Sequence, residues 1–120
     1  MNNLALLLRA QGQYAAAEPL YRRALEIREK QLGPDHPNTA LSMNNLAELL
    51  RDQGQYATAE PLYRCALEIW EKQLGRDHPK VATGLNNLAT LLNSQGQYAA
   101  AEPLVRRALE IFEKQLVSNK

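Results

Sequence analysis

The fold is decided by the segment MNNLAELLRDQGQYATAEPLYRCALEIWEKQLGRDHP at residues 43–79, because most of it recurs on both sides of itself. The string NNLA begins at Asn2, Asn44 and Asn86, which sets a period of 42 residues. Residues 2–37 differ from the second copy at only six positions, so the period is unambiguous. A repeat of this length is one supersecondary unit that must bury its apolar face against its neighbours. The sequence therefore predicts a repeat array.

Each copy has the pattern of two helices joined by a short turn. In the second copy, the first helix carries an apolar stripe and ends at Gly54, because glycine readily adopts the left-handed conformation that follows a helix. The second helix is predicted from about Tyr56 to Leu74, with one broad apolar face. Asp77 then precedes Pro79 by two residues, which predicts an acidic cap before the first helix of the next copy.

This pattern predicts an all-α solenoid of helix pairs, with about six helices in a single domain over residues 1–120. The predicted repeats are 1–36, 37–78 and 79–120, with no polar capping helix after the third.

The second helix of each copy also carries a ladder of charges at four-residue steps. In the second copy the ladder consists of Glu60, Arg64, Glu68 and Lys72. Oppositely charged side chains at this spacing stabilise a helix in water. We interpret the ladder as a solvated outer face rather than as a binding strip.

The composition excludes several classes of function. Lys plus Arg number 14 and Asp plus Glu 13, and a net charge of +1 provides no field that would attract nucleic acid or an anionic membrane. The single cysteine, Cys65, forms no internal disulfide, and no segment approaches the roughly 18 apolar residues of a membrane span. The N-terminus lacks a basic leader and a cleavage site, so we expect a soluble cytoplasmic protein without nucleic-acid or membrane partners.

The small and aromatic residues of each copy resemble the tetratricopeptide repeat, in which small side chains let two helices approach each other. In the first copy the matching residues are Gly12, Tyr14, Ala17, Tyr21, Ala24 and Leu25. The 42-residue period and the strings NNLA.LL..QGQY, AEPLYRRALEI and LG.DHP look like the kinesin light chain variety of this repeat. The resemblance implies a right-handed superhelix of antiparallel helix pairs. Its concave groove would be lined by the first helix of each unit and would bind peptide segments of partner proteins.

Two positions depart from the pattern. Val105 replaces the tyrosine of the first two copies, and Arg28 stands where the other copies have Trp70 and Phe112. Aromatic residues at this place indicate core between repeats. Position 28 is therefore predicted to lie where successive repeats meet, and the first junction is expected to pack differently.

Differences among the copies indicate which face of the first helix binds a ligand. On a helical wheel, the variable positions 6/48/90, 9/51/93 and 10/52/94 share one face, opposite Leu46 and Leu50. Positions that stack between repeats must stay alike, so the variable face is the one that meets solvent or ligand. The candidate groove residues are Asn3, Leu6, Leu41, Asn44, Asn45, Glu48, Arg51, Asp52, Thr83, Asn86, Asn87, Thr90 and Asn93.

A pair of asparagines on this face recurs in every copy. An amide offers both donors and an acceptor, so it can hold the backbone of a peptide without reading its sequence. We expect Asn45 and Asn87 above all to do so. The alternative is that one asparagine of each pair ties neighbouring helices together. The residues that vary are expected to select the ligand, namely Leu6, Glu48, Arg51, Asp52, Thr90 and Asn93.

The sequence gives little support to catalysis. His36 and His78 recur with the turn that contains them and are expected to have a capping role, since one imidazole per repeat is a poor metal site. Cys65 is expected to be inert, because only Arg64 beside it offers the positive setting that a reactive thiol needs. We therefore expect no enzyme activity, no cofactor and no metal.

The C-terminal helix is expected to leave Leu109, Phe112 and Leu116 partly uncovered. Either the chain is a segment of a longer array, or it covers this face by self-association. The leading functional hypothesis is a scaffold that binds a peptide segment of a protein partner. The alternative is a structural, self-assembling spacer without a ligand of its own.

Overall fold

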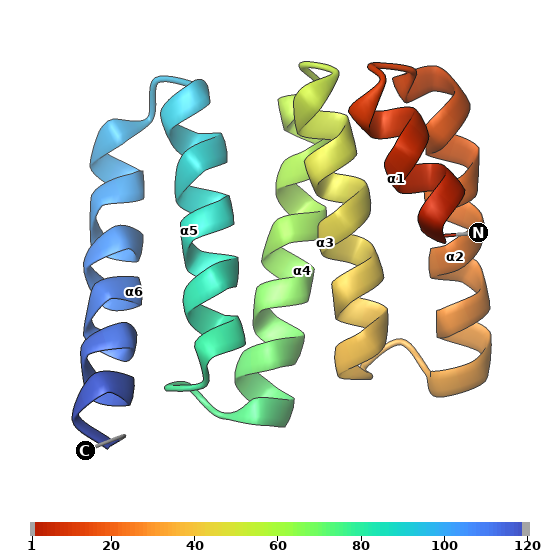
Figure 1. The fold of residues 1–120 in the computed structure, drawn as a ribbon. Coiled ribbons are helices and arrows are strands. Elements are labelled where there is room, and N and C mark those ends of the chain that lie inside the picture. Colours follow the sequence, from red (N-terminus) through yellow and green to blue (C-terminus); the bar gives the residue numbers. More distant parts are fainter. Residues whose placement is uncertain (1, 119–120) are drawn as a thin grey trace.

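The computed structural model describes residues 2–118, and within them it has six α-helices arranged as three pairs (Figure 1). Each helix packs against the next one along the chain. The predicted all-α solenoid of antiparallel pairs is thereby confirmed. The helices are α1 Asn2–Ala10, α2 Tyr14–Leu32, α3 Pro37–Asp52, α4 Tyr56–Leu74, α5 Pro79–Ser94 and α6 Tyr98–Ser118.

The turn inside each pair depends on a glycine. Gly54 follows α3 with a φ of 79°, a left-handed conformation that costs glycine little and most other residues more. The backbone N–H of Gln55 then donates to the carbonyl of Leu50 at 2.8 Å, which satisfies one of the last carbonyls of the helix. The predicted end of the first helix at this glycine is confirmed.

The longer first helices are capped by histidine. Nδ1 of His78 accepts a hydrogen bond from the backbone N–H of Lys80 at 3.1 Å, and His36 caps α3 in the same way. The predicted capping role of the histidines is confirmed, but the predicted acidic cap is wrong. Pro79 occupies the first helical position, so the cap falls on the residue just before it, and Asp77 lies one residue too early. The carboxylate of Asp77 instead accepts from Lys114 Nζ at 3.2 Å.

The pairs build two layers of helices. Hydrogen bonds join the first helices of successive pairs: Arg9 of α1 donates to Glu48 of α3 at 3.1 Å, and Asn87 of α5 donates to Asn44 of α3 at 3.1 Å. Arg107 of α6 reaches Glu71 of α4 at 3.3 Å and so joins two second helices. The apolar core lies between the layers and contains leucines of α3 and α5, alanines of every pair, and Trp70.

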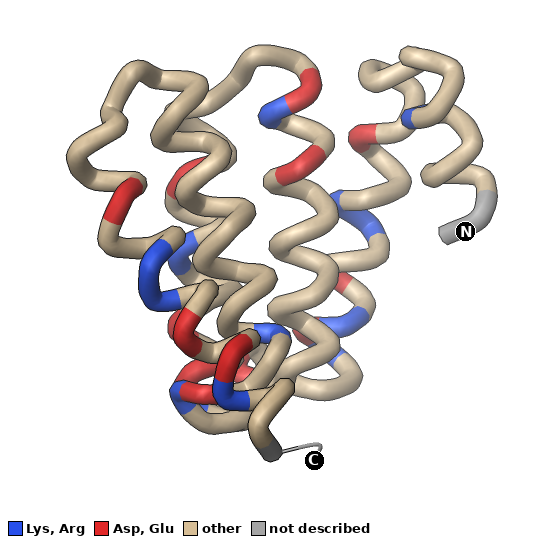
Figure 2. Tube along the Cα trace, turned by 60° about the vertical axis from the view of Figure 1, so that its left-hand side comes forward, with Lys and Arg blue, Asp and Glu red and all other residues tan. Residues whose placement is uncertain are grey.

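The charge ladder faces solvent, as predicted. Its first step is an ion pair in every repeat, at 2.9 Å for Glu18–Arg22, 3.0 Å for Glu60–Arg64 and 2.6 Å for Glu102–Arg106. The hydrogen bond from Arg22 lowers the pKa of Glu18 below its ordinary value. Positive and negative residues are interspersed along the chain (Figure 2). Among the helices described, none is long and apolar enough to cross a membrane.

Candidate binding face and the junctions between repeats

The candidate groove residues of α3 and α5 differ in how far they are exposed. Thr83, Thr90 and Asn93 of α5 are open to solvent, whereas Glu48 and Arg51 of α3 are half-buried. Leu6 of α1 is exposed, while the side chain of Asn3 lies outside the described residues. Leu41, Asn45, Asn86 and Asn87 are half-buried, and Asn44 is only 4% exposed.

Asn44 and Asn87 form a link between repeats. Nδ2 of Asn87 donates to Oδ1 of Asn44 at 3.1 Å, and Nδ2 of Asn44 donates to Oε1 of Glu48 at 3.0 Å. These contacts are those of the alternative considered for the asparagines, a tie between neighbouring helices. Asn45 holds in the second repeat the position that Asn87 holds in the third. A role of these amides in peptide binding stays a prediction.

Arg9 makes the main electrostatic contact of the first junction, which we define as the packing of α2 and α1 against α3. Its Nε donates to Asp52 at 2.7 Å and its Nη1 to Glu48 at 3.1 Å. Burial alone would lower the pKa of Arg9, but its hydrogen bond to Asp52 and the charges of Asp52 and Glu48 raise the pKa above its ordinary value. The acids of the second repeat therefore neutralise the arginine of the first.

The second junction, the packing of α4 and α3 against α5, lacks this arrangement. Arg51 is the counterpart of Arg9, but the third repeat has Thr90 and Ser94 in place of the two acids. The hydroxyls of Thr90 and Ser94 donate to carbonyls of their own helix, at 2.9 and 3.1 Å. Among the described residues, the only carboxylate within 4.0 Å of the Arg51 guanidinium is that of the adjacent Asp52. The second junction thus presents a half-buried cation that the next repeat does not neutralise.

Tyr63 lies close enough to this arginine to be affected by its charge. Its hydroxyl is buried and has no hydrogen-bond partner among the described residues. Burial raises the pKa of Tyr63 above its ordinary value, and the charge of Arg51 opposes that rise. A buried hydroxyl without a partner is a net cost to folding.

We predict that Tyr63→Phe stabilises the chain by about 1 kcal/mol, because it removes an unpaired polar group and keeps the ring in the core. Chemical denaturation of the two proteins measures the difference. The conservative change at the counterpart, Tyr21→Phe, serves as a control, because burial of Tyr21 is less complete and it lies beside Arg9. A destabilised Tyr63→Phe protein would show that the hydroxyl has a favourable partner.

The two junctions are also filled differently, as predicted from position 28. Trp70 is 1% exposed, its Nε1 donates to the carbonyl of Pro37 at 3.2 Å, and Lys80 Nζ lies 5.8 Å from its ring centroid. A Cβ added to Gly84 would come within 3.3 Å of the Trp70 ring, so the glycine makes room for the indole. Trp70 is core between repeats, and that prediction is confirmed.

The first junction has Arg28 and Ser42 at the corresponding positions. Nη1 of Arg28 donates to the carbonyl of Asn38, near the start of α3, at 3.1 Å. A small cavity of about 50 Å³ remains here. Its lining includes Tyr21, Arg28, Leu41, Ser42 and Asn45.

Phe112, the third residue of this series, was predicted to be partly uncovered, and that prediction is confirmed. Its side chain is 40% exposed, because no helix within residues 2–118 packs on the outer side of α6. Leu109 and Leu116, which were predicted to be uncovered with it, are exposed as well.

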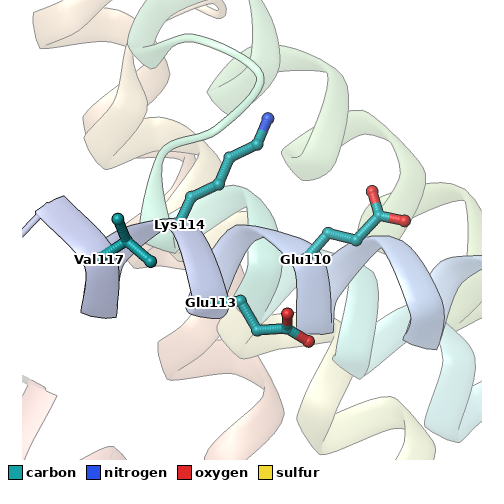
Figure 3. Close-up of a pocket in the computed structure, with 4 residues that line it drawn as sticks. All are labelled: Glu110, Glu113, Lys114 and Val117. Atoms are coloured by element: carbon teal, nitrogen blue, oxygen red, sulfur yellow. The ribbon is translucent and has the colours of Figure 1, made fainter.

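A hollow of about 550 Å³ lies near the C-terminal end of α6. Figure 3 shows that its four lining residues all come from this one helix and fan out from it, with Glu110 and Lys114 pointing to one side and Glu113 to another. Since no second element closes the hollow, it has the geometry of an exposed helix surface. Within residues 2–118, no three His, Cys, Asp or Glu side chains gather as metal ligands.

The geometry described so far defines the class of molecule as an α-helical repeat protein. The tetratricopeptide repeat family matches residues 1–69 and 42–114, which together span nearly the whole chain. The chain therefore belongs to the tetratricopeptide repeat family. Proteins of this family are typically scaffolds for interactions between proteins and typically non-catalytic, and no catalytic family matches.

Solved structures agree with this assignment. BtubC (BKLC) from P. vanneervenii is 30% identical, with a TM-score of 0.85 over 92% of this chain and 44% of its own. A putative kinesin light chain of Podosopora anserina with nearly identical repeats is 27% identical, with a TM-score of 0.86 over 94% of this chain and 54% of its own. The chain thus spans about half the length of the structures it matches. No curated protein matches it.

Two residues that govern the junctions were not singled out from the sequence in the roles they have. Arg9 belongs to a position that the sequence comparison marked as variable, but its acidic partners lie in the next repeat. For Tyr63, the sequence indicated only that this tyrosine belongs to the pattern of the repeat. A comparison of Arg9 with Glu48 and Asp52, and of Arg51 with Thr90 and Ser94, would have revealed the loss of pairing.

Proposed function

We propose that the chain is a protein-interaction scaffold whose first helices bind an extended peptide segment of a partner, and that Arg51 anchors an acidic side chain of that segment. The observation that carries the proposal is the half-buried guanidinium of Arg51, which lacks the two acids that its counterpart Arg9 has in the next repeat. Arginine binds carboxylates through paired hydrogen bonds, and such contacts gain strength where water is partly excluded.

The asparagines contribute backbone contacts in this proposal. Asn45 is half-buried on α3, six residues before Arg51, and in this proposal its amide meets the backbone of a segment that reaches the guanidinium. Asn87 has one N–H engaged with Asn44 and keeps its amide oxygen as an acceptor. Leu6, Thr90 and Asn93 border this region and are exposed. They would distinguish one ligand sequence from another.

We predict that peptides with a suitably placed glutamate bind the chain and that Arg51→Gln weakens this binding about tenfold, equivalent to about 1.4 kcal/mol. The probes are labelled extended peptides, each with one glutamate moved through a neutral background of serine and alanine. Fluorescence anisotropy measures the dissociation constants. Asn45→Ala is expected to weaken all binding peptides alike, because it removes a backbone contact.

The third repeat offers a sharper variant of the same experiment. Thr90→Glu with Ser94→Asp gives Arg51 the two acids that Arg9 already has, so the guanidinium should be neutralised within the protein and peptide binding should fall. The matched control is Thr58→Glu with Ala100→Asp, which adds the same two acids at exposed positions of α4 and α6 and should leave peptide binding unchanged. Equal affinity for peptides with and without glutamate would contradict the role of Arg51.

A second candidate function, a self-assembling structural spacer, is favoured by a different observation. Large apolar side chains are exposed on both terminal helices, on Leu4 and Leu7 of α1 and on Leu109, Phe112 and Leu116 of α6. If the chain binds none of the probe peptides but forms oligomers, the spacer is the better account.

A further inference from the structure

We infer that copies of the chain associate head to tail, with α1 of one copy packing on α6 of the next in the geometry of the internal junctions. The inference rests on the second candidate function and specifies it. It names the two faces that meet, their register and the polarity of the assembly. The contact would be one more junction of the kind that the chain already contains twice.

The first face lies on α6. Val105, Leu109, Phe112 and Leu116 form one stripe at helical spacing, and each is at least 40% exposed. Their counterparts on α4 are Tyr63, Leu67, Trp70 and Leu74, of which the first three are buried and the last is half-buried. The difference between the two helices is that α5 packs on α4, whereas none of the described helices packs on the outer side of α6. The stripe therefore has the residues of a junction without the helix that covers it.

The second face lies on α1. Leu4 and Leu7 are 51% and 53% exposed, while the same positions of the second repeat, Leu46 and Leu49, are almost fully buried. Ala5 is buried in the first repeat too, because its own partner α2 covers it. Leu4 and Leu7 are thus the residues that depend on a preceding second helix for their burial. None of the described helices covers them.

The internal junctions set the register of the contact. A Cβ on Gly84 would meet both Leu67 and Trp70, so the residues of α5 that follow Gly84 run along the earlier part of α4, toward Tyr63. Tyr21 and Asn45 line one cavity, which gives the first junction the same register. Because α1 begins at the position equivalent to residue 86, it covers Val105 and Leu109 and leaves Phe112 and Leu116 less covered.

The first helices bring no charges together in this contact. The first junction pairs Arg9 with Glu48 and Asp52, but the corresponding positions between copies are Asn93 of one copy and Leu6 and Ala10 of the other. The contact between the first helices is therefore apolar. Between the second helices, Arg23 of one copy and Glu113 of the other stand at the positions where Arg107 and Glu71 form an ion pair in the second junction. A mainly apolar contact with one such pair should persist in added salt.

The two faces differ and lie at opposite ends of the row of helices (Figure 1). An interface between two different faces is open-ended, because each added copy leaves one unpaired α6 face or α1 face to which a further copy can bind. Head-to-tail association therefore gives chains of increasing length. A contact of α6 with α6 would stop at a dimer.

Sedimentation velocity over a concentration series tests the inference with three variants of the full chain. Leu109→Glu charges the α6 face, Leu4→Glu charges the α1 face, and Ala100→Glu is the matched control, because position 100 and its counterparts are exposed in every repeat. Circular dichroism establishes that each variant is folded. The unmodified chain and Ala100→Glu should show a mass that rises steadily with concentration, at low and at high salt. Each of the other two variants alone should remain a monomer.

The mixture of the two face variants is the decisive sample. Leu109→Glu keeps an intact α1 face and Leu4→Glu an intact α6 face, so an equimolar mixture should form a dimer with one good junction and nothing larger. If Leu4→Glu alone still self-associates while Leu109→Glu does not, the contact is α6 with α6. The head-to-tail geometry is then overturned while self-assembly stands. An unmodified chain that stays monomeric at all concentrations overturns both, and peptide binding through Arg51 is unaffected by either result.

Discussion

Replacing Trp70 by alanine is expected to lower the free energy of unfolding by about 3–5 kcal/mol, the largest effect of any single substitution considered for this chain. The indole is buried between α3, α4 and α5, and its removal leaves a cavity against Gly84 that leucine neighbours cannot fill without moving. The hydrogen bond to the Pro37 carbonyl is lost as well. Urea unfolding followed by far-ultraviolet circular dichroism is the suitable measurement, because Trp70 is the only tryptophan and its fluorescence disappears with it.

The repeat supplies a matched control for this experiment. Phe112 occupies the same position in the third repeat but is largely open to solvent, so Phe112→Ala should cost less than about 1 kcal/mol when measured on the dilute chain. Comparable losses for the two substitutions would mean that α6 is covered in solution, or that the second junction is looser than its contacts indicate.

The second large effect on stability is expected when two residues of the first junction are replaced by their counterparts from the second. Arg28→Trp together with Ser42→Gly reproduces the Trp70–Gly84 pair and should fill the cavity, with a gain of about 1–3 kcal/mol. Arg28→Trp alone should be neutral or destabilising, since Ser42 carries the Cβ for which the Trp70–Gly84 pair leaves no room.

A double-mutant cycle on positions 28 and 42 measures this dependence directly. The expected coupling between the two substitutions is favourable and about 1–3 kcal/mol, because each change is useful only in the presence of the other. Additive effects would show that the two junctions differ in more than this one pair of residues, for instance in the spacing of their helices.

The helices could be predicted from the sequence because their signals are local. Gly54 ends a helix through its own conformational freedom, and Pro79 begins one because it lacks an N–H to donate. The identity of the cap was harder, since Asp77 and His78 are both plausible and a shift of one residue decides between them. Only the position of the first helical turn settles that question.

The pairing across repeats could not be read from the period. The period places Arg9 and Arg51 at equivalent positions, but it does not say which residues of the following repeat stand beside them. That depends on the crossing of the helices, which brings residues 39 and 43 positions apart into hydrogen-bond distance. A helical wheel considers one helix alone, so it placed Asn44 on the variable face. The packing of α5 on α3 buries this residue.

The contacts between successive helices also determine which end of the molecule unfolds first. Within residues 2–118 the main contacts join each helix to the next, so one end can unzip while the other stays intact. The N-terminal end is the weaker one, because α1 has only nine residues and the first junction contains the cavity. Amide protons of α1 and α2 should therefore exchange with solvent first and those of α4 and α5 last, because the repeats unfold one after another from the N-terminal end.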